Sequence, residues 1–238
     1  MNSKFPGAAA LLALTLAACS EKPADTSAPA TAVNDTAAAP TTSAPPSIEG
    51  LPAGAYKIDP SHASLVFTVN HLGFSHYTGQ FTRFTADLTL DPANPAAAQL
   101  SATVDPASLS IPSPPDGFVD ELTGEQWINA KAFPQMTFKS TSVAITGANT
   151  ADVAGDFTLR GVTKPVTLAV TFNGGWKGIP QDPHARIGFS AKGVLKRSEF
   201  GIDYGVPAPG STSGVSDDVT IAIEAEFTGP PMAATPAQ

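Results

Sequence analysis

Residues 219–227, VTIAIEAEF, form the longest and cleanest alternation of apolar and polar side chains in the sequence. Val219, Ile221, Ile223, Ala225 and Phe227 occupy every second position, with mostly polar residues between them. Successive side chains of a β-strand point to opposite faces, so this period of two predicts a strand with one buried face. The segment therefore indicates a sheet with one apolar side.

The same alternation recurs in seven earlier segments. Turn-forming runs separate several of them, such as Asp91–Pro95, Asn173–Gly175 and Pro180–Pro183. Between Phe138 and Val143 the apolar face slips, which suggests a β-bulge. The predicted strands contain residues 65–71, 84–90, 100–104, 136–145, 153–159, 166–172, 187–191 and 219–227.

One helical segment interrupts the strands. Residues 123–126, Thr-Gly-Glu-Gln, fit a capping box, with Trp127 and Ile128 behind it. The prediction is therefore an all-β domain of eight antiparallel strands with one short helix after the third strand. Such a pattern is typical of a barrel or a sandwich.

Composition excludes several classes of protein. Only 14% of the 238 residues are charged, and 23 prolines and 20 glycines argue against a coiled coil or a long helical bundle. The formal charge of −8 gives no electrostatic support for nucleic-acid binding. A single cysteine excludes a disulfide framework within the chain and a cysteine-based zinc site. We predict no metal and no resident cofactor.

The N-terminus has the pattern of a secretory signal. Lys4 precedes the apolar run from Ala8 to Ala18, which is too short for a membrane span. Leu-Ala-Ala-Cys at 16–19 resembles the lipobox of bacterial lipoproteins, which implies lipid attachment at Cys19; the alternative is an ordinary signal peptide with a chance cysteine. Ser20, where aspartate would indicate inner-membrane retention, favours a periplasmic protein anchored to the outer membrane.

The remainder divides by composition. After the signal peptide at 1–18, residues 19–53 are predicted to be a lipidated N-terminus and a disordered linker rich in alanine, proline, serine and threonine. Residues 54–229 form the predicted β-domain, and residues 230–238 a disordered tail.

A series of motifs between Tyr56 and Phe227 resembles the YceI-like family of bacterial periplasmic lipid-binding proteins. The motifs are YKIDPSH at 56–62, FTVNHLG at 67–73, GQF at 79–81, FP at 133–134, FKST at 138–141, LRGVTKPV at 159–166, RSEFG at 197–201 and DV at 218–219. The resemblance implies a lipocalin-like eight-stranded barrel whose apolar tunnel holds a polyisoprenoid or a similar lipid tail, such as that of a prenyl quinone. It also allows a homodimer, because family members commonly pair.

Large apolar side chains, most of them on the predicted strands, are the candidate tunnel walls. An isoprenoid tail binds by removal of apolar surface from water, and rigid aromatic rings suit that task. An inward phenylalanine is also ordinary core in many β-proteins, and the pattern alone does not decide which face points inward. The candidate ligand-binding residues are Phe67, Val69, Phe81, Phe84, Phe118, Trp127, Phe133, Phe138, Phe157, Leu159 and Phe189.

Polar residues in the motifs allow further readings. We expect His71 to form a hydrogen bond inside one barrel end and His76 to lie on the surface. The charged residues Arg160, Lys164, Arg197, Glu199 and Asp203 form either ion pairs and loop anchors at a barrel end or a mouth for a polar headgroup. No Gly-x-Ser-x-Gly motif and no nucleophile–base pair is evident, so we predict a protein that is not an enzyme.

The leading hypothesis is a membrane-tethered periplasmic protein that sequesters or transports an isoprenoid or a related amphiphile. The alternatives are a structural or stress-response envelope protein without a specific ligand and, less simply, a small-substrate enzyme that uses His71 or the charged mouth.

Overall fold

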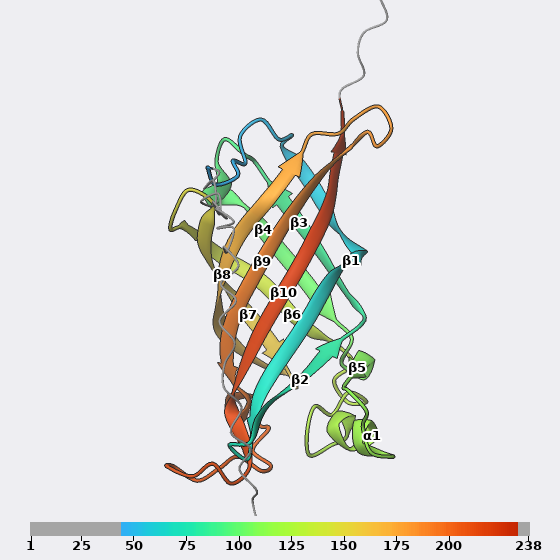
Figure 1. Ribbon diagram of the computed structural model, residues 1–238, viewed down its shortest axis with the longest axis vertical. Coiled ribbons are helices and arrows are strands. Elements are labelled where there is room, and N and C mark those ends of the chain that lie inside the picture. The colour runs from blue at the N-terminus through green and yellow to red at the C-terminus, as the bar shows by residue number, and fades with distance from the viewer. Residues whose placement is uncertain (1–43, 233–238) are drawn as a thin grey trace, which may run out of the picture. The chain divides into compact units, whose positions relative to one another are not determined.

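The computed structural model describes residues 44–232, and Figure 1 shows a barrel of antiparallel strands with one short helix. The strands are β1 (Gly54–His71), β2 (Ser75–Phe81), β3 (Phe84–Leu90), β4 (Gln99–Val104), β5 (Leu109–Ser110), β6 (Met136–Ile145), β7 (Thr150–Leu159), β8 (Val162–Trp176), β9 (His184–Lys196) and β10 (Val215–Pro231). The helix is α1 (Phe118–Thr123), and short 3-10 turns occur at Pro95–Ala97, Pro106–Ser108 and Arg197–Phe200.

Eight of these strands close the barrel. They follow the order β10-β9-β8-β7-β6-β4-β3-β1, and β1 pairs with β10 to complete the ring. These are the eight segments that the alternation predicted, so the eight-stranded antiparallel barrel is confirmed. Closure leaves the ring without a free edge, and the apolar face of each strand then points into the interior.

β1 changes its partner halfway along its length. Gly54–Lys57 pair with β3, whereas Leu65–His71 pair with β2. An irregularity in the pairing with β10 between Ile58 and Ala63 marks the change. The extra residues shift the inward positions from even to odd numbers along β1, as expected for a bulge. β2 and β5 extend the sheet from β1 and were not among the predicted strands.

The expected slip of face in β6 is confirmed. The pairing of β6 with β7 is interrupted between Ser140 and Ser142. The helix lies between β4 and β6, after the third barrel strand, as predicted.

The expected capping box at residues 123–126 is wrong. α1 ends at Thr123 rather than beginning there, and the Thr123 hydroxyl donates to the Val119 carbonyl oxygen at 2.9 Å. A threonine hydroxyl that bonds the carbonyl four residues back lies inside a helix and cannot cap its N-terminus. Gly117, with φ of 75°, precedes the helix and Gly124 follows it.

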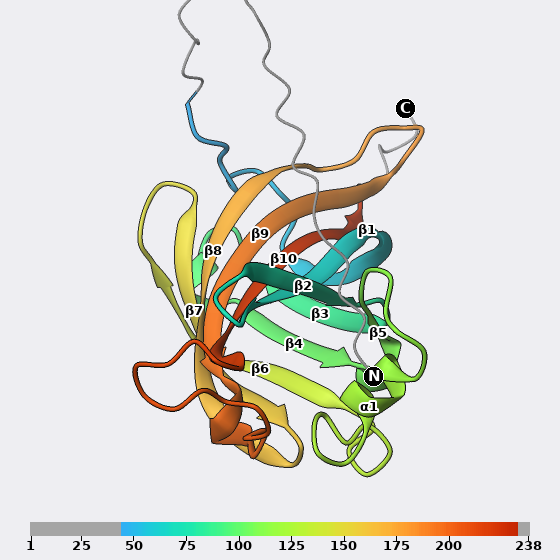
Figure 2. The ribbon, with the colours of Figure 1, turned by 60° about the horizontal axis from the view of Figure 1, so that its bottom comes forward.

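Two ends of the barrel organise the rest of the molecule. The "terminal end" holds the start of β1, the end of β10 and the loops 91–98, 146–149 and 177–183; the "helix end" holds α1, the β1–β2 turn and the loop 201–214. Figure 2 views the barrel with α1 beside β5 and β2 crossing in front. Of the described N-terminal residues, Ile48 and Leu51 pack against a cluster that includes Tyr56, Leu90 and Phe227 at the terminal end.

Residues 230–232 belong to the fold rather than to the predicted disordered tail, because β10 extends through Pro231 and the Met232 amide donates to the Pro183 carbonyl oxygen at 2.6 Å. The signal peptide, Cys19, most of the linker and residues 233–238 lie outside the described residues. Within residues 44–232, no helix has the length and hydrophobicity needed to cross a membrane.

Candidate binding cavity

A cavity of about 940 Å³ occupies the interior of the barrel. Its lining begins at the terminal end with Ile48, Pro95 and Asn149 and reaches Phe118 and Tyr204 at the helix end. The cavity therefore follows the barrel from one end toward the other, and its volume lies at the upper end of the range typical of small-molecule sites.

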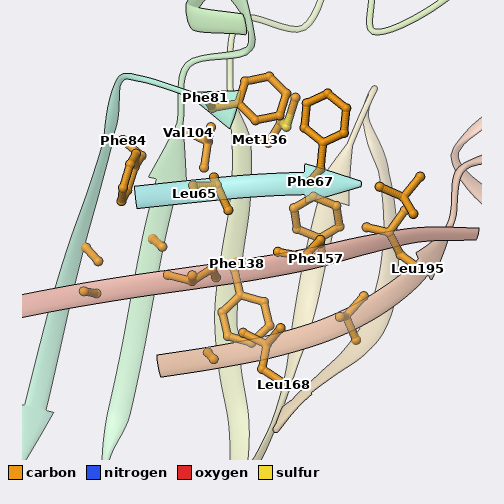
Figure 3. Close-up of a pocket in the computed structure, with 18 of the residues that line it drawn as sticks. Leu65, Phe67, Phe81, Phe84, Val104, Met136, Phe138, Phe157, Leu168 and Leu195 are labelled. Atoms are coloured by element: carbon orange, nitrogen blue, oxygen red, sulfur yellow. The ribbon is translucent and has the colours of Figure 1, made fainter. Parts of the chain in front are cut away.

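The walls of the cavity are almost entirely apolar. They come from the inward positions of all eight barrel strands, which the pleat places on one face. Figure 3 shows the labelled side chains converging on the interior from several strands. These are Leu65, Phe67, Phe81, Phe84, Val104, Met136, Phe138, Phe157, Leu168 and Leu195.

All but one of the residues predicted to contact a ligand line this cavity. Those that do so are Phe67, Val69, Phe81, Phe84, Phe118, Trp127, Phe138, Phe157, Leu159 and Phe189. Phe133 is not among the lining residues. It covers the β7–β8 turn, where a Cβ on Gly161 would lie 2.9 Å from the Phe133 ring. That any of the lining residues contacts a lipid stays a prediction.

Several lining residues were not singled out from the sequence. Leu65, Val104, Leu168 and Ile221 belong to the same alternation as the aromatic residues, so the signal for them was present. The cavity also includes residues with polar groups at the helix end, for which periodicity gives no signal. These include His71, Tyr77, Glu121, Arg197 and Tyr204.

Two glycines leave room for aromatic rings along the wall. A Cβ on Gly79 would lie 2.4 Å from the Phe67 ring, and a Cβ on Gly155 would lie 2.4 Å from the Phe138 ring. In each pair the ring packs directly over the backbone of the neighbouring strand, because glycine offers no side chain to displace it. The rings therefore cover the wall closely and leave the middle of the barrel open.

Arg197 anchors the loop at the helix end. Its side chain is 4% exposed, and its guanidinium donates to the carbonyl oxygens of Ile202, Tyr204 and Val215 at 2.8 Å and of Ser216 at 2.9 Å. Burial lowers the pKa of Arg197 from its usual value. Because main-chain carbonyl oxygens accept all of these hydrogen bonds, Arg197 acts as an anchor for the loop. Its contacts do not match the alternative that the charged motif residues bind a polar headgroup.

Trp127 stands between two arginines. The Arg197 guanidinium lies 5.2 Å from the Trp127 ring centroid, a cation–π distance, and Tyr204 meets the same ring edge-on at 5.5 Å. Arg160 donates to the carbonyl oxygens of Trp127 and Glu125. These contacts fix the segment after α1 against the barrel, whereas Glu199 and Asp203 are exposed.

The histidines do not converge on a site. His71 and His76 lie on neighbouring strands of the β1–β2 hairpin, and both are exposed. His71 lines the cavity at the helix end beside Tyr77, as expected of a residue at a barrel end, but its side chain is exposed rather than enclosed. His62 pairs with Asp59 at 3.1 Å. Within residues 44–232, no three His, Cys, Asp or Glu residues form a group that could hold a metal ion.

Comparison with known proteins adds to this geometry. The model of the YceI-like domain matches residues 56–227. A UPF0312 protein of Pseudomonas putida (strain W619) is 39% identical over 175 residues, which cover 71% of this chain and 85% of that protein.

Two solved structures share the fold. The crystal structure of BcnA from Burkholderia cenocepacia is 27% identical, covers 71% of this chain and 98% of that one, and superposes with a TM-score of 0.59. A polyisoprenoid-binding domain from Saccharophagus degradans is 12% identical, with coverage of 74% and 99% and a TM-score of 0.54, a likeness of fold alone. On the match over residues 56–227 and the extent of these similarities, the chain belongs to the YceI-like family.

Proposed function

We propose that this protein binds the tail of a polyisoprenoid, or of a similar amphiphilic lipid such as a prenyl quinone, in the cavity of its barrel. The observation that carries the proposal is the continuous apolar cavity of about 940 Å³. An envelope protein with a solid core would have no need for such a space, and side chains normally fill protein interiors to high density.

The chemistry of the walls matches an uncharged, flexible hydrocarbon. At roughly 0.8 kcal/mol per buried CH₂ group, each five-carbon isoprene unit contributes about 3–4 kcal/mol before costs are counted. Ordering the chain and losing its free translation offset much of this gain. The barrel is formed before the ligand arrives, so the protein's own share of the ordering cost is small. The polyisoprenoid-binding neighbour of the same fold agrees with this assignment.

The polar residues support binding rather than catalysis. Arg197 is committed to main-chain carbonyl oxygens, and the two histidines near the helix end, His71 and His76, are exposed. An acid–base or nucleophilic mechanism needs such groups held within hydrogen-bond reach of one another.

Intrinsic fluorescence tests the binding directly. Trp127 and Trp176 are the only tryptophans of the chain, and only Trp127 lines the cavity. With Trp176→Phe, the remaining fluorescence reports on the cavity. We expect a long-chain prenyl quinone to quench Trp127 saturably, at concentrations at which the tailless quinone does not. Equal quenching by both compounds would show that the tail makes no contribution and would contradict the proposal.

We further propose that the barrel is tethered through a lipid on Cys19 to a bacterial membrane, facing the periplasm. The lipobox-like run before Cys19 supports this anchor. Two or more acyl chains hold a protein stably on a membrane, whereas one is marginal. Cys19→Ser is expected to move the full chain from the membrane fraction to the soluble fraction. Retention of the variant on washed membranes would refute the anchor while leaving the binding proposal intact.

A further inference from the structure

Three large apolar side chains lie exposed at the tip of the β8–β9 hairpin. Trp176, Ile179 and Met232 are 46%, 41% and 38% exposed, and we call them the apolar tip. Met232 belongs to this surface because its backbone amide bonds Pro183 and a Cβ on Gly178 would lie 2.7 Å from its Cγ. Lys177, also exposed, lies beside Trp176 in the chain.

A β-bulge turns Trp176 outward. Phe172 faces the cavity, and strict alternation would place Trp176, four residues later, on the same inner face. The pairing of β8 with β9 is irregular between Phe172 and Gly174, and Trp176 then pairs with Arg186, next to the buried Ile187. Directly opposed residues share a face, so Trp176 points outside with Arg186. The inserted residue thus exposes a tryptophan that would otherwise be buried.

Ion pairs fix the hairpin that carries the tip. The Arg186 guanidinium bonds Asp182 within the hairpin at 2.8 Å and reaches Asp59 in β1 at 3.0 Å. Asp59 lies in the bulged part of β1, so two irregular segments are fastened to each other. The apolar tip is therefore tied to the barrel, and apolar side chains that gather in one exposed patch, unlike single scattered ones, mark an interaction surface.

The tip lies at the terminal end, where the N-terminal chain enters the barrel (Figure 1). Ile48 and Leu51 pack at this end, and the cavity lining there includes the exposed Ile145 and Gly147 at the β6–β7 turn. The 24 residues between Cys19 and Ala44 allow a span of at most about 90 Å when fully extended. A lipid on Cys19 would therefore keep the barrel within that distance of the bilayer, and the chain from Cys19 joins the barrel at the terminal end.

We propose that the apolar tip docks on the interface of a lipid bilayer, so that the cavity mouth at the terminal end faces the membrane from which the ligand is taken. Tryptophan suits the headgroup region, where one side of the ring is in contact with acyl chains and the indole N–H is in contact with water. The neighbouring Lys177 complements anionic lipids. The inference rests on the proposed lipid binding for its purpose, but the docking can be measured without it.

The test uses the full chain with Cys19→Ser, which removes the anchor, and Trp127→Phe, which leaves Trp176 as the sole tryptophan. Vesicles of phosphatidylethanolamine and phosphatidylglycerol in a 3:1 ratio serve as the probe. We expect their addition to shift Trp176 emission to the blue, and brominated acyl chains to quench it. An unchanged spectrum at saturating vesicle concentrations would overturn the proposal.

Variants distinguish vesicle binding through the apolar tip from nonspecific binding through other exposed apolar residues. Ile179→Ser with Met232→Ser is expected to lower the vesicle partition coefficient at least fivefold. Val194→Ser is the matched control, since Val194 is 57% exposed on the same hairpin but near the helix end. Phe74, 86% exposed at the helix end, tests the opposite orientation. A loss of binding with Phe74→Ser but not with the tip variant would show that the helix end faces the membrane, and would refute the inference.

The two proposals fail separately. Prenyl quinone binding in solution, followed through Trp127 in the Trp176→Phe chain, reports on the cavity alone. We expect the Ile179→Ser and Met232→Ser changes to leave that binding unchanged but to slow uptake from vesicles. Equal uptake rates from vesicles would contradict docking at the tip, whereas docking without any quinone binding would contradict only the proposed function.

Discussion

Filling the cavity with the protein's own side chains should weaken lipid binding without harming the fold. Ala86 and Ala102 are directly paired on β3 and β4, and both line the cavity. The double variant Ala86→Leu with Ala102→Leu adds six carbon atoms to one part of the wall, slightly more than one isoprene unit. A long tail would then have to give up about one unit of its buried length.

The expected size of the effect follows from that displacement. One isoprene unit contributes about 3–4 kcal/mol gross, part of which is offset by the ordering of the chain. A net loss of about 1.4–2.8 kcal/mol corresponds to a roughly 10- to 100-fold rise in Kd for a tail that fills the cavity. A short prenyl alcohol that leaves this region empty should bind with nearly unchanged affinity.

Stability distinguishes an open cavity from a solid core. Leucine in an empty apolar space buries new surface at a rotamer cost of about 0.5–1 kcal/mol per residue, so the free energy of unfolding should stay level or rise. In a filled core, each added side chain would cost about 1–3 kcal/mol through strain. Denaturant unfolding and ligand titration are compared with Ala169→Leu, on the exposed face of β8. A destabilised double variant with normal long-tail affinity would refute the reasoning.

Three further predictions concern single positions. The pKa of Asp59 is lowered from 3.8 to about 2 by hydrogen bonds from His62, the Ser61 amide and Arg186. The ionised carboxylate of Asp59 therefore stabilises the fold above a pH of about 4, and this contribution is lost as the pH falls toward 2. Asp59→Asn should flatten this part of a Tm-against-pH curve, and an unaltered acid limb would contradict the assignment. Arg197→Met should cost at least about 3 kcal/mol in urea unfolding, because buried carbonyl oxygens lose a charged donor; a loss below 1 kcal/mol would argue against the anchor. Gly79→Ala should push the Phe67 ring toward the cavity and weaken long-tail binding, which calorimetry would detect as a raised Kd.

The strand pattern was readable from sequence because closure of a barrel requires every strand to carry one apolar face. VTIAIEAEF at 219–227 became β10, and seven weaker alternations became the other barrel strands. β2 was not predicted because its residues, SHYTGQF, are mostly polar, and because Gly79, at one of its inward positions, has no side chain. The Phe67 ring packs over Gly79, and this contact between β1 and β2 cannot be deduced from the sequence of either strand alone.

The inward face could not be decided from the pattern because bulges change its phase. Tyr56 and Ile58 point inward at even positions of β1, and after the bulge Leu65 and Phe67 point inward at odd ones. The aromatic residues were nevertheless a good guide to the walls. Phe133 was the exception, because it packs over Gly161 at the β7–β8 turn instead of facing the cavity.

Arg197 shows the same limit for polar groups. The motif that contains Arg197 singled it out, but its role is defined by four main-chain carbonyl oxygens from one loop and the next strand. Every residue has a carbonyl group, so the sequence does not indicate which of them Arg197 contacts. The helix was misplaced by a few residues for a related reason, since the Thr123 hydroxyl could serve either end of a helix.

Native mass spectrometry of the full chain, after incubation with a long-chain prenyl quinone, measures the central claim most directly. The proposed cavity predicts one bound quinone per protein chain, and at a quinone concentration near the Kd of the unmodified chain it predicts much less adduct in the Ala86→Leu and Ala102→Leu variant than in Ala169→Leu. A spectrum with no adduct, or with equal adducts in both variants, would mean that the lipid is not held inside the barrel.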